Sequence, residues 1–141
     1  MTTWLKPSMT VFVDTSAFYA VLDRADENHV RARDTWLRLL QEDHVFLTTN
    51  YVLLETCALL QNRLGIPALR AFHQDLVPLL QIDWILEDRH QSGVEAALVA
   101  ARKRLSVVDC IAFQTMRERG VATAFCFDRH YREQGFSVVP K

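Results

Sequence analysis

Two aspartates stand directly after short apolar runs of the chain. Asp14 follows a run of β-branched and aromatic residues at 10–13, and Asp128 follows a second run at 122–127. Runs of this length and composition are typical of buried strands, so each acid is predicted at the carboxyl end of a strand. An aspartate in such a position can also simply start a turn or cap the next helix. Each acid is therefore a weak signal when taken alone.

A third acid, Glu55, lies inside a segment, 51–60, that is apolar over most of its length. If this segment is a helix, Glu55 shares its face with Tyr51, Ala58, Leu59 and Asn62. An ionised carboxylate on an apolar helix is costly unless it is paired or bound to a cation. The alternative is a partly exposed glutamate beside Asn62, which would need no partner.

A fourth acid, Asp109, comes three residues after Ser106. This spacing is that of a capping box, with aspartate in place of the usual glutamate. Asp109 can therefore be a purely structural cap. The two roles are also compatible, because a carboxylate in the first turn of a helix is held in place and stabilised by the helix dipole.

Taken together, the four acids predict a site for divalent cations. Four like charges at one edge of a sheet would repel, and one or more would take up a proton unless a cation were bound. Oxygen ligands suit Mg²⁺ or Mn²⁺, and carboxylate-bound ions of this kind cleave phosphodiesters. A zinc site is not predicted, since none of the five histidines has HxxxH or HExxH spacing. The three cysteines form no CxxC pair and are expected to be reduced and buried.

The rest of the sequence predicts elements that would bring these acids together. Apolar runs predict strands at 10–13, 45–48, 79–86, 121–127 and 136–139. Between them, apolar periodicity and helix signals predict helices at 16–23, 28–40, 50–63, 67–76, 88–102 and 107–119, with Asn28 and Asn50 as caps. Strands that alternate with helices indicate an α/β fold with a mostly parallel central sheet and helices on both faces. Ligands bind such sheets beyond the carboxyl ends of the strands.

Length and composition fit one globular domain. We expect this domain at 9–141, preceded by a tail at 1–8, with Met9 as a possible alternative start. The 16 basic and 17 acidic residues give a net charge of −1, which neither indicates nor excludes a nucleic-acid partner. No apolar run approaches the roughly 20 residues that span a bilayer, and 1–8 lacks a signal-peptide core. We therefore expect a cytoplasmic protein without a membrane partner.

Four ordered motifs resemble those of PIN-domain nucleases. They are VDTSA at 13–17, Glu55 after a strand and a helix cap, LSVVDC at 105–110, and FDRHY at 127–131 followed by Gly135. Their order covers nearly the whole chain, and the full set is far more specific than any single motif. The chain is especially similar to VapC-type toxins, which are compact ribonucleases paired with an antitoxin.

The resemblance implies a three-layer α/β/α sandwich, Mg²⁺ or Mn²⁺ as cofactor, and hydrolysis of RNA. By the family pattern, Asp14, Glu55 and Asp109 ligate the metal, and Asp128 assists directly or through water. Ser16, or Thr15, would hydrogen-bond a ligand or the phosphate. The resemblance also implies a toxin of a type II toxin–antitoxin pair, a small antitoxin protein as partner, and a homodimer.

Basic residues near these motifs are candidates for substrate binding. Arg102, Lys103 and Arg104 precede the third motif, where some relatives carry an acid, and Arg129 follows Asp128. They could form a phosphate-contacting rim beside the acids. The alternative for the triplet is a solvated helix end favoured by the dipole.

Other functions fit the motifs less well. A haloacid-dehalogenase-type phosphatase needs a second aspartate two residues after the nucleophile, where this chain has Ser16. A phosphoacceptor receiver domain needs an acid pair near the first strand, and Asp14 is followed by Thr15. Two alternatives within the resemblance stay open: a PIN nuclease that acts in RNA processing, and an inactive PIN domain that binds RNA or protein.

Overall fold

The structure, a computed structural model, describes residues 8–101 and 105–141. Its centre is a five-stranded sheet in the order β3-β2-β1-β4-β5, in which every neighbouring pair is parallel. The strands are β1 (Thr10–Val13), β2 (Val45–Thr49), β3 (Leu80–Asp83), β4 (Thr123–Phe125) and β5 (Ser137–Val139). The predicted parallel α/β sheet is confirmed.

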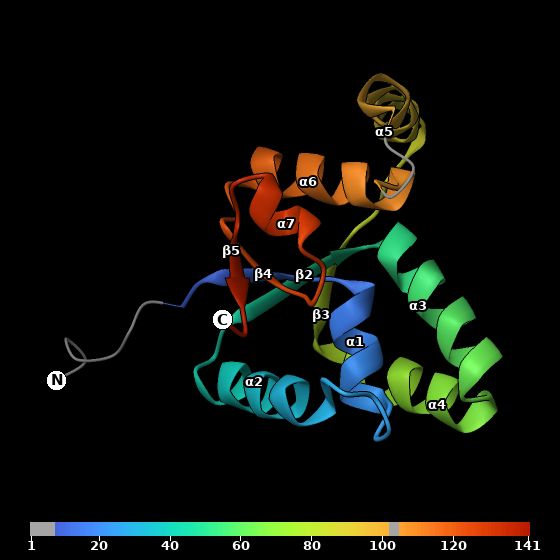
Figure 1. The fold of residues 1–141 in the computed structure, drawn as a ribbon, viewed down its shortest axis with the longest axis vertical. Helices are drawn as coiled ribbons and strands as arrows, with labels where there is room; N and C mark the ends of the chain where they lie inside the picture. The colour runs from blue at the N-terminus through green and yellow to red at the C-terminus, as the bar shows by residue number, and fades with distance from the viewer. Residues whose placement is uncertain (1–7, 102–104) are drawn as a thin grey trace, which may run out of the picture.

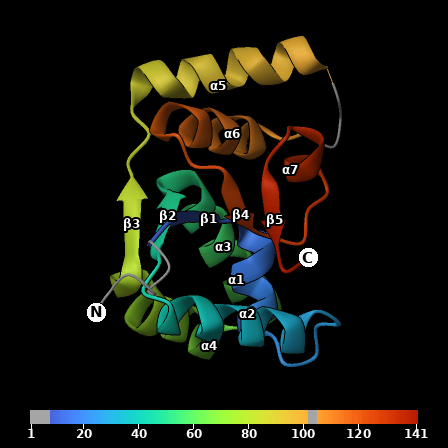
Figure 2. The same cartoon turned by 90° about the vertical axis from the view of Figure 1, so that its left-hand side faces the viewer.

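Helices cover both faces of this sheet. They are α1 (Thr15–Leu22), α2 (His29–Gln41), α3 (Asn50–Arg63), α4 (Ile66–Ala71), α5 (Glu87–Ala100), α6 (Val107–Arg119) and α7 (His130–Glu133), with π-helical and 3-10 turns at Phe72–Leu76 and Val77–Leu79. Helices α1 and α2 lie on one face, and α6 and α7 lie on the other (Figures 1 and 2). Helix α5 packs on α6, farther from the sheet. The predicted three-layer sandwich is thus confirmed.

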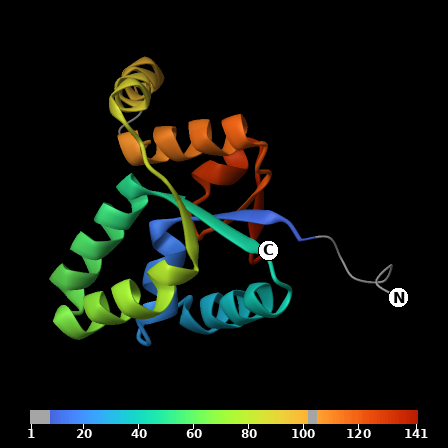
Figure 3. The same ribbon diagram turned by 180° about the vertical axis from the view of Figure 1, so that it is seen from behind.

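Helix α3 leaves the carboxyl end of β2 and runs along one side of the molecule to α4 (Figure 3). It contacts α1 and, less extensively, α6. Because α1, α3 and α6 all begin near the carboxyl edge of the sheet, their first turns lie close together (Figure 1). This is the edge at which parallel α/β sheets bind ligands.

The core forms between the sheet and its helices. The central strand β1 is buried on both faces, with Phe12 fully enclosed. On the α1 side, the rings of Phe18 and Phe72 meet edge to face at 5.0 Å between centroids. On the other side, Tyr131 contacts Phe113 at 4.9 Å. Burial of each such side chain stabilises the fold by about 1.5–3 kcal/mol.

The start of α3 differs from the sequence-based prediction. The cap is Thr49 rather than Asn50, because the Thr49 hydroxyl accepts the N–H of Val52 at 3.2 Å. The Asn50 side chain instead bonds the backbone of Ile85, accepting its N–H at 2.6 Å. The Asn50 side chain, predicted as the cap, is therefore bonded to a distant segment of the chain instead. No local pattern predicts this contact.

Three further elements differ from expectation. Strand β3 ends at Asp83, before the exposed Trp84 and Leu86, and β4 is confined to three residues. The short helix α7 was not predicted. Asn28 does precede α2, but its side chain makes no capping hydrogen bond. No helix within 8–101 or 105–141 has both the length and the hydropathy that crossing a membrane requires.

Candidate active site

Asp14 occupies the junction between β1 and α1. It is the N-cap of α1, where Oδ2 accepts the backbone N–H of Ser16 at 3.1 Å and its hydroxyl at 2.7 Å. The residue is only 5% exposed. Burial raises the pKa of Asp14, and the nearby charge of Asp128 raises it further, although the hydrogen bonds from Ser16 and Tyr131 oppose the rise. The capping role considered for a lone strand-end aspartate is therefore present, at the centre of a group of acids.

Ser16 joins the two strand ends of the site. Its hydroxyl donates to Asp14 and at the same time accepts the backbone N–H of Phe127 at 2.9 Å. Both hydrogen-bonding functions of the hydroxyl are thus used inside the protein. Ser16 is therefore placed to position Asp14 against the segment that carries Asp128.

Tyr131 is a site residue that the sequence reasoning missed. Its phenol donates to Oδ1 of Asp14 at 3.0 Å, and the residue is fully buried. Burial and the surrounding carboxyl groups raise the pKa of Tyr131 well above its usual value, so the phenol stays a donor. The only sequence signal was its place in the FDRHY motif, three residues after Asp128. Tertiary packing, not spacing, aims it at Asp14.

Glu55 lies in the second turn of α3 and reaches the site from the opposite side. The residue is exposed, as in the alternative of a partly exposed glutamate beside Asn62. Its carboxyl group is nevertheless partly desolvated, which raises its pKa. A hydrogen bond with Thr15 opposes this rise, and the charges of Asp14 and Asp128 add to it. Glu55 is thus an exposed acid that faces the other acids.

Asp109 forms the capping box predicted at the start of α6. Its Oδ2 accepts the N–H of Ser106 at 3.2 Å, and its own N–H donates to the Ser106 hydroxyl at 3.1 Å. Asp109 is 9% exposed. Burial, followed by the charges of Asp14 and Asp128, raises its pKa to about 6. The structural role and membership of the acidic site coexist in this residue.

Asp128 lies in the loop after β4. Its Oδ1 accepts the backbone N–H of His130 at 2.9 Å, which fixes the carboxylate at the start of α7. The His130 ring is buried and bonds Glu133 through Nδ1 at 3.1 Å.

All four predicted acids line one open groove of about 780 Å³, although they come from four different segments. The lining residues are Asp14, Thr15, Ser16, Glu55, Ala58, Leu59, Asn62, Ser106, Asp109 and Asp128. The groove lies where the strands end and α1, α3 and α6 begin. Its negative charge contributes to the raised pKa of three of its acids.

The donor set of the acidic groove fits Mg²⁺ or Mn²⁺ better than zinc. The acids offer only oxygen ligands, and their mutual repulsion is relieved by a cation. Within 8–101 and 105–141, no group of three or more Asp, Glu, His or Cys side chains is already arranged to hold a metal ion, so the acids would have to move closer together around a bound ion. An open arrangement suits Mg²⁺, which keeps several waters and takes one or two carboxylates. Cys57, Cys110 and Cys126 are free thiols, as predicted, but only Cys110 and Cys126 are also buried, whereas Cys57 is half-buried.

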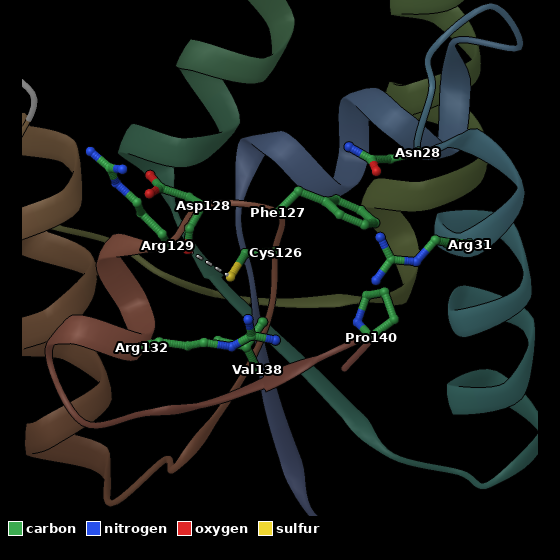
Figure 4. Close-up of a pocket in the computed structure, with 9 residues that line it drawn as sticks. All are labelled: Asn28, Arg31, Cys126, Phe127, Asp128, Arg129, Arg132, Val138 and Pro140. Atoms are coloured by element: carbon green, nitrogen blue, oxygen red, sulfur yellow. Dashed lines mark hydrogen bonds between the residues drawn. The ribbon is translucent and has the colours of Figure 1, made fainter.

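The predicted basic residues divide into two groups. Arg102, Lys103 and Arg104 lie outside the described residues. Arg129 is exposed, 3.9 Å from Glu133, and lines a second, smaller hollow of about 230 Å³. This hollow also includes Asp128 and two arginines that the sequence reasoning did not single out, Arg31 and Arg132 (Figure 4).

Comparisons with known proteins agree with this arrangement. Residues 11–137 match the PIN domain. The chain is 30% identical over 130 residues to the 23S rRNA-specific endonuclease VapC20 of Mycobacterium tuberculosis, covering 92% of this chain and 97% of the relative.

Solved structures give the same result. The crystal structure of Mycobacterium tuberculosis VapC20, described as a sarcin-ricin loop cleaving toxin, superposes with a TM-score of 0.79 at 29% identity, covering 89% of this chain and 95% of that chain. FitAcB from Neisseria gonorrhoeae, at 14% identity and a TM-score of 0.65, shares the fold over 91% of this chain and 95% of its own. The resemblance to PIN nucleases of the VapC type, stated from motifs alone, is confirmed. The chain belongs to the PIN-domain family.

Proposed function

We propose that the chain is a Mg²⁺- or Mn²⁺-dependent endoribonuclease of the VapC toxin type, with its nuclease domain at 9–141. The observation that carries this proposal is the convergence of four acids, from four separate segments, on one groove at the carboxyl edge of the sheet. We further propose the sarcin-ricin loop of 23S rRNA as the substrate, because the VapC20 relatives are named for 23S rRNA and the solved structure for that loop.

In this proposal Asp14, Glu55 and Asp109 hold the metal, and Asp128 assists directly or through water. An ion held by these residues would supply the activation of water and the stabilisation of the leaving oxygen that phosphodiester hydrolysis requires. The protein's own contribution is to fix the acids before substrate arrives. Ser16 and Tyr131 hold the two oxygens of Asp14, and the capping box holds Asp109. Such preorganisation avoids the cost of reorienting charges during the reaction.

A small antitoxin protein and a second copy of the chain are the proposed partners, and the cytoplasm is the proposed location. Apolar side chains on the outer surface support protein partners. On α5, Leu98 and Val99 are 72% and 87% exposed, and Leu54 on α3 is 72% exposed. By contrast, Phe18 on α1 and Trp36 on α2 are buried in the core and do not contribute to such a surface.

The proposed activity is tested by incubating purified protein with a panel of defined RNAs that includes a hairpin with the sarcin-ricin loop sequence. Each RNA is incubated with EDTA, Mg²⁺ or Mn²⁺. We expect cleavage at one position of the hairpin with either ion and none in EDTA. If another RNA is cut while the hairpin stays intact, the proposed substrate is wrong. If no RNA is cut, the proposed ribonuclease activity is wrong.

The toxin role is tested by expression in bacterial cells. Expression of the wild type alone should arrest growth, and Asp14→Asn should relieve the arrest at equal levels of folded protein. Asp34→Asn is the matched control, because Asp34 is an exposed acid on α2 that pairs with Arg33. Unimpeded growth with abundant folded wild type would contradict the toxin role and leave the nuclease chemistry untouched.

A further inference from the structure

The smaller hollow beside the acidic groove has the opposite chemical character. We name it the arginine pocket, and it is lined by Asn28, Arg31, Cys126, Phe127, Asp128, Arg129, Arg132, Val138 and Pro140. We propose that the arginine pocket binds a phosphate of the RNA backbone that neighbours the scissile phosphate. This inference rests on the proposed ribonuclease function and adds a second contact point for the same substrate.

Contacts with neighbouring residues orient Arg31 on one side of the arginine pocket. It comes from α2, and its guanidinium lies over the ring of Phe127 at 5.6 Å from the centroid. Its Nη2 also donates to the backbone carbonyl of Lys141 at 3.1 Å. These two contacts orient the guanidinium, and its other N–H groups donate to no residue in 8–101 or 105–141. A planar guanidinium fixed in this way loses little entropy when it binds an anion.

Arg132 faces Arg31 from the other side. It comes from α7, and Figure 4 shows both guanidinium groups extending toward the middle of the hollow, near Val138 and Pro140. Within the described part of the chain, the Arg132 guanidinium forms no hydrogen bond or ion pair. Two like charges that face each other repel, and an anion between them removes that repulsion. Phosphate is a preferred partner for paired arginines.

Arg129 has a different orientation. In Figure 4 its side chain extends toward the carboxylate of Asp128 rather than toward the centre of the hollow. Its nearest ion-pair partner is Glu133, at 3.9 Å. Arg129 therefore lies at the boundary between the arginine pocket and the acidic groove, and the anion site itself is formed by Arg31 and Arg132.

The position of the arginine pocket favours nucleic acid over an unrelated anion. Asp128 lines both the pocket and the acidic groove, so the two are continuous along the loop after β4. A strand whose scissile phosphate lies among the acids would pass Asp128 and bring a neighbouring phosphate to the arginines. At about 230 Å³ the pocket is smaller than the roughly 300–1,000 Å³ that encloses a whole small ligand. It suits a single backbone group.

The test measures binding rather than cleavage. The parent protein is Asp14→Asn in EDTA, and the probe is a fluorescent RNA hairpin of the sarcin-ricin loop sequence, titrated by anisotropy at several salt concentrations. Arg132→Ala should weaken binding about tenfold, the size of one charge-assisted hydrogen bond. It should also lower the slope of log K against log salt by about 0.7–0.9. Arg132→Lys should restore the slope and only part of the affinity.

Arg33→Ala is the matched control, because Arg33 lies on the same helix as Arg31, is exposed, pairs with Asp34 and does not line the pocket. It should change neither affinity nor slope. A second measurement locates the contact by replacing single phosphates near the cleavage site with uncharged methylphosphonates. One replacement should weaken binding to the parent and have no further effect on Arg132→Ala.

The outcomes separate this proposal from the proposed function. If Arg132→Ala behaves as Arg33→Ala does, or if the parent does not bind the hairpin, the arginine pocket is not an RNA site. If Arg132→Ala keeps RNA binding but loses binding of a polyglutamate peptide, the pocket serves an acidic protein segment instead. If RNA binding depends on Arg132 while the wild type cuts no RNA with Mn²⁺, the pocket proposal stands and the nuclease proposal fails.

Discussion

The acidic groove and the arginine pocket share Asp128 but are constructed in opposite ways. In the groove, Asp14 and Asp109 are short side chains fixed at the first turns of helices by capping hydrogen bonds. In the pocket, Arg31 and Arg132 are long side chains that extend into one hollow from α2 and α7. Carboxylates that ligate one metal ion must lie close to that ion, whereas a flexible RNA strand can bring its phosphate to a guanidinium group. The difference suggests that chemistry is confined to the groove and that the pocket contributes to binding.

The two regions also differ in their energetic cost. In the groove, like charges lie close together and are partly desolvated, which makes their ionised forms less favourable. The raised pKa values of Asp14, Glu55 and Asp109 reflect this cost of ionisation. The arginine pocket lies at the surface, where solvent screens the charges of Arg31, Arg129 and Arg132. Cation binding should therefore affect stability strongly through the groove, while substitutions in the pocket should leave stability nearly unchanged.

Removal of metal should give the largest difference between the acidic groove and the arginine pocket. Cleavage of RNA should fall about a thousandfold or more in EDTA, because a bound ion contributes several kcal/mol to transition-state stabilisation. Affinity for RNA through the arginine pocket should persist. The measurement pairs a gel assay of cleavage with anisotropy in the same buffers. Full activity of freshly purified protein in chelator would exclude the metal mechanism.

Asp109→Asn should separate the cap from the metal ligand. The substitution keeps a hydrogen-bond acceptor for the capping box but removes the anion, so cleavage should fall by about a hundredfold or more. The metal-free variant should be at least as stable as the wild type at about pH 7.5, well above the folded-state pKa of Asp109. It should also gain less stability when Mn²⁺ is added, since stabilisation by a ligand follows its affinity. Wild-type cleavage and a wild-type metal shift would show that Asp109 is only a cap.

The stability of the metal-free protein should depend on pH in a defined direction. The pKa of Asp109 is about 6 in the folded protein, compared with the usual value of 3.8 expected in the unfolded chain. The folded state therefore binds more protons between these values, so stability falls as pH rises through this range and levels off above the folded-state pKa. The loss is at most about 3 kcal/mol. Thermal melts from about pH 4.5 to about 7.5 should show it, and Asp109→Asn should flatten the curve. An unchanged curve would mean that another acid carries the shift.

Replacement of Arg102, Lys103 and Arg104 by alanine tests a second basic region against the arginine pocket. If the triplet touches phosphates, the slope of log K against log salt should fall by about 0.7–0.9 for each phosphate that is no longer neutralised. Thermal stability should change little. Salt titrations of the triple variant and of Arg132→Ala would show which region carries more of the affinity. An unchanged slope would leave the triplet as a solvated helix end.

Tyr131→Phe should give the smallest effect. It removes the hydrogen bond to Asp14 and keeps the ring packed against Phe113. We expect a loss of about tenfold in cleavage, the equivalent of one hydrogen bond to a charged group. RNA binding in EDTA should not change, because Tyr131 does not line the arginine pocket. Equal loss of cleavage and binding would indicate that the substitution disturbs α7 as a whole.

Much of the fold and of the acidic groove was predictable from local patterns. Apolar runs and helix signals determine the α/β order, and the rule for parallel sheets places Asp14 and Asp128 at one edge. The capping box at Ser106 and Asp109 is visible as a spacing of three residues. These features depend on neighbours within one turn or one strand, so sequence alone reveals them.

Other features depend on contacts between distant segments, which the chain order does not reveal. Tyr131 reaches Asp14 from 117 residues away, and Asn50 leaves the cap of α3 to bond Ile85. The exposure of Glu55 depends on what covers α3. Arg31 and Arg132 are ordinary surface arginines in the sequence, far apart along the chain. They line one pocket only because α2 and α7 pack around the end of β4 and place both side chains along the same hollow.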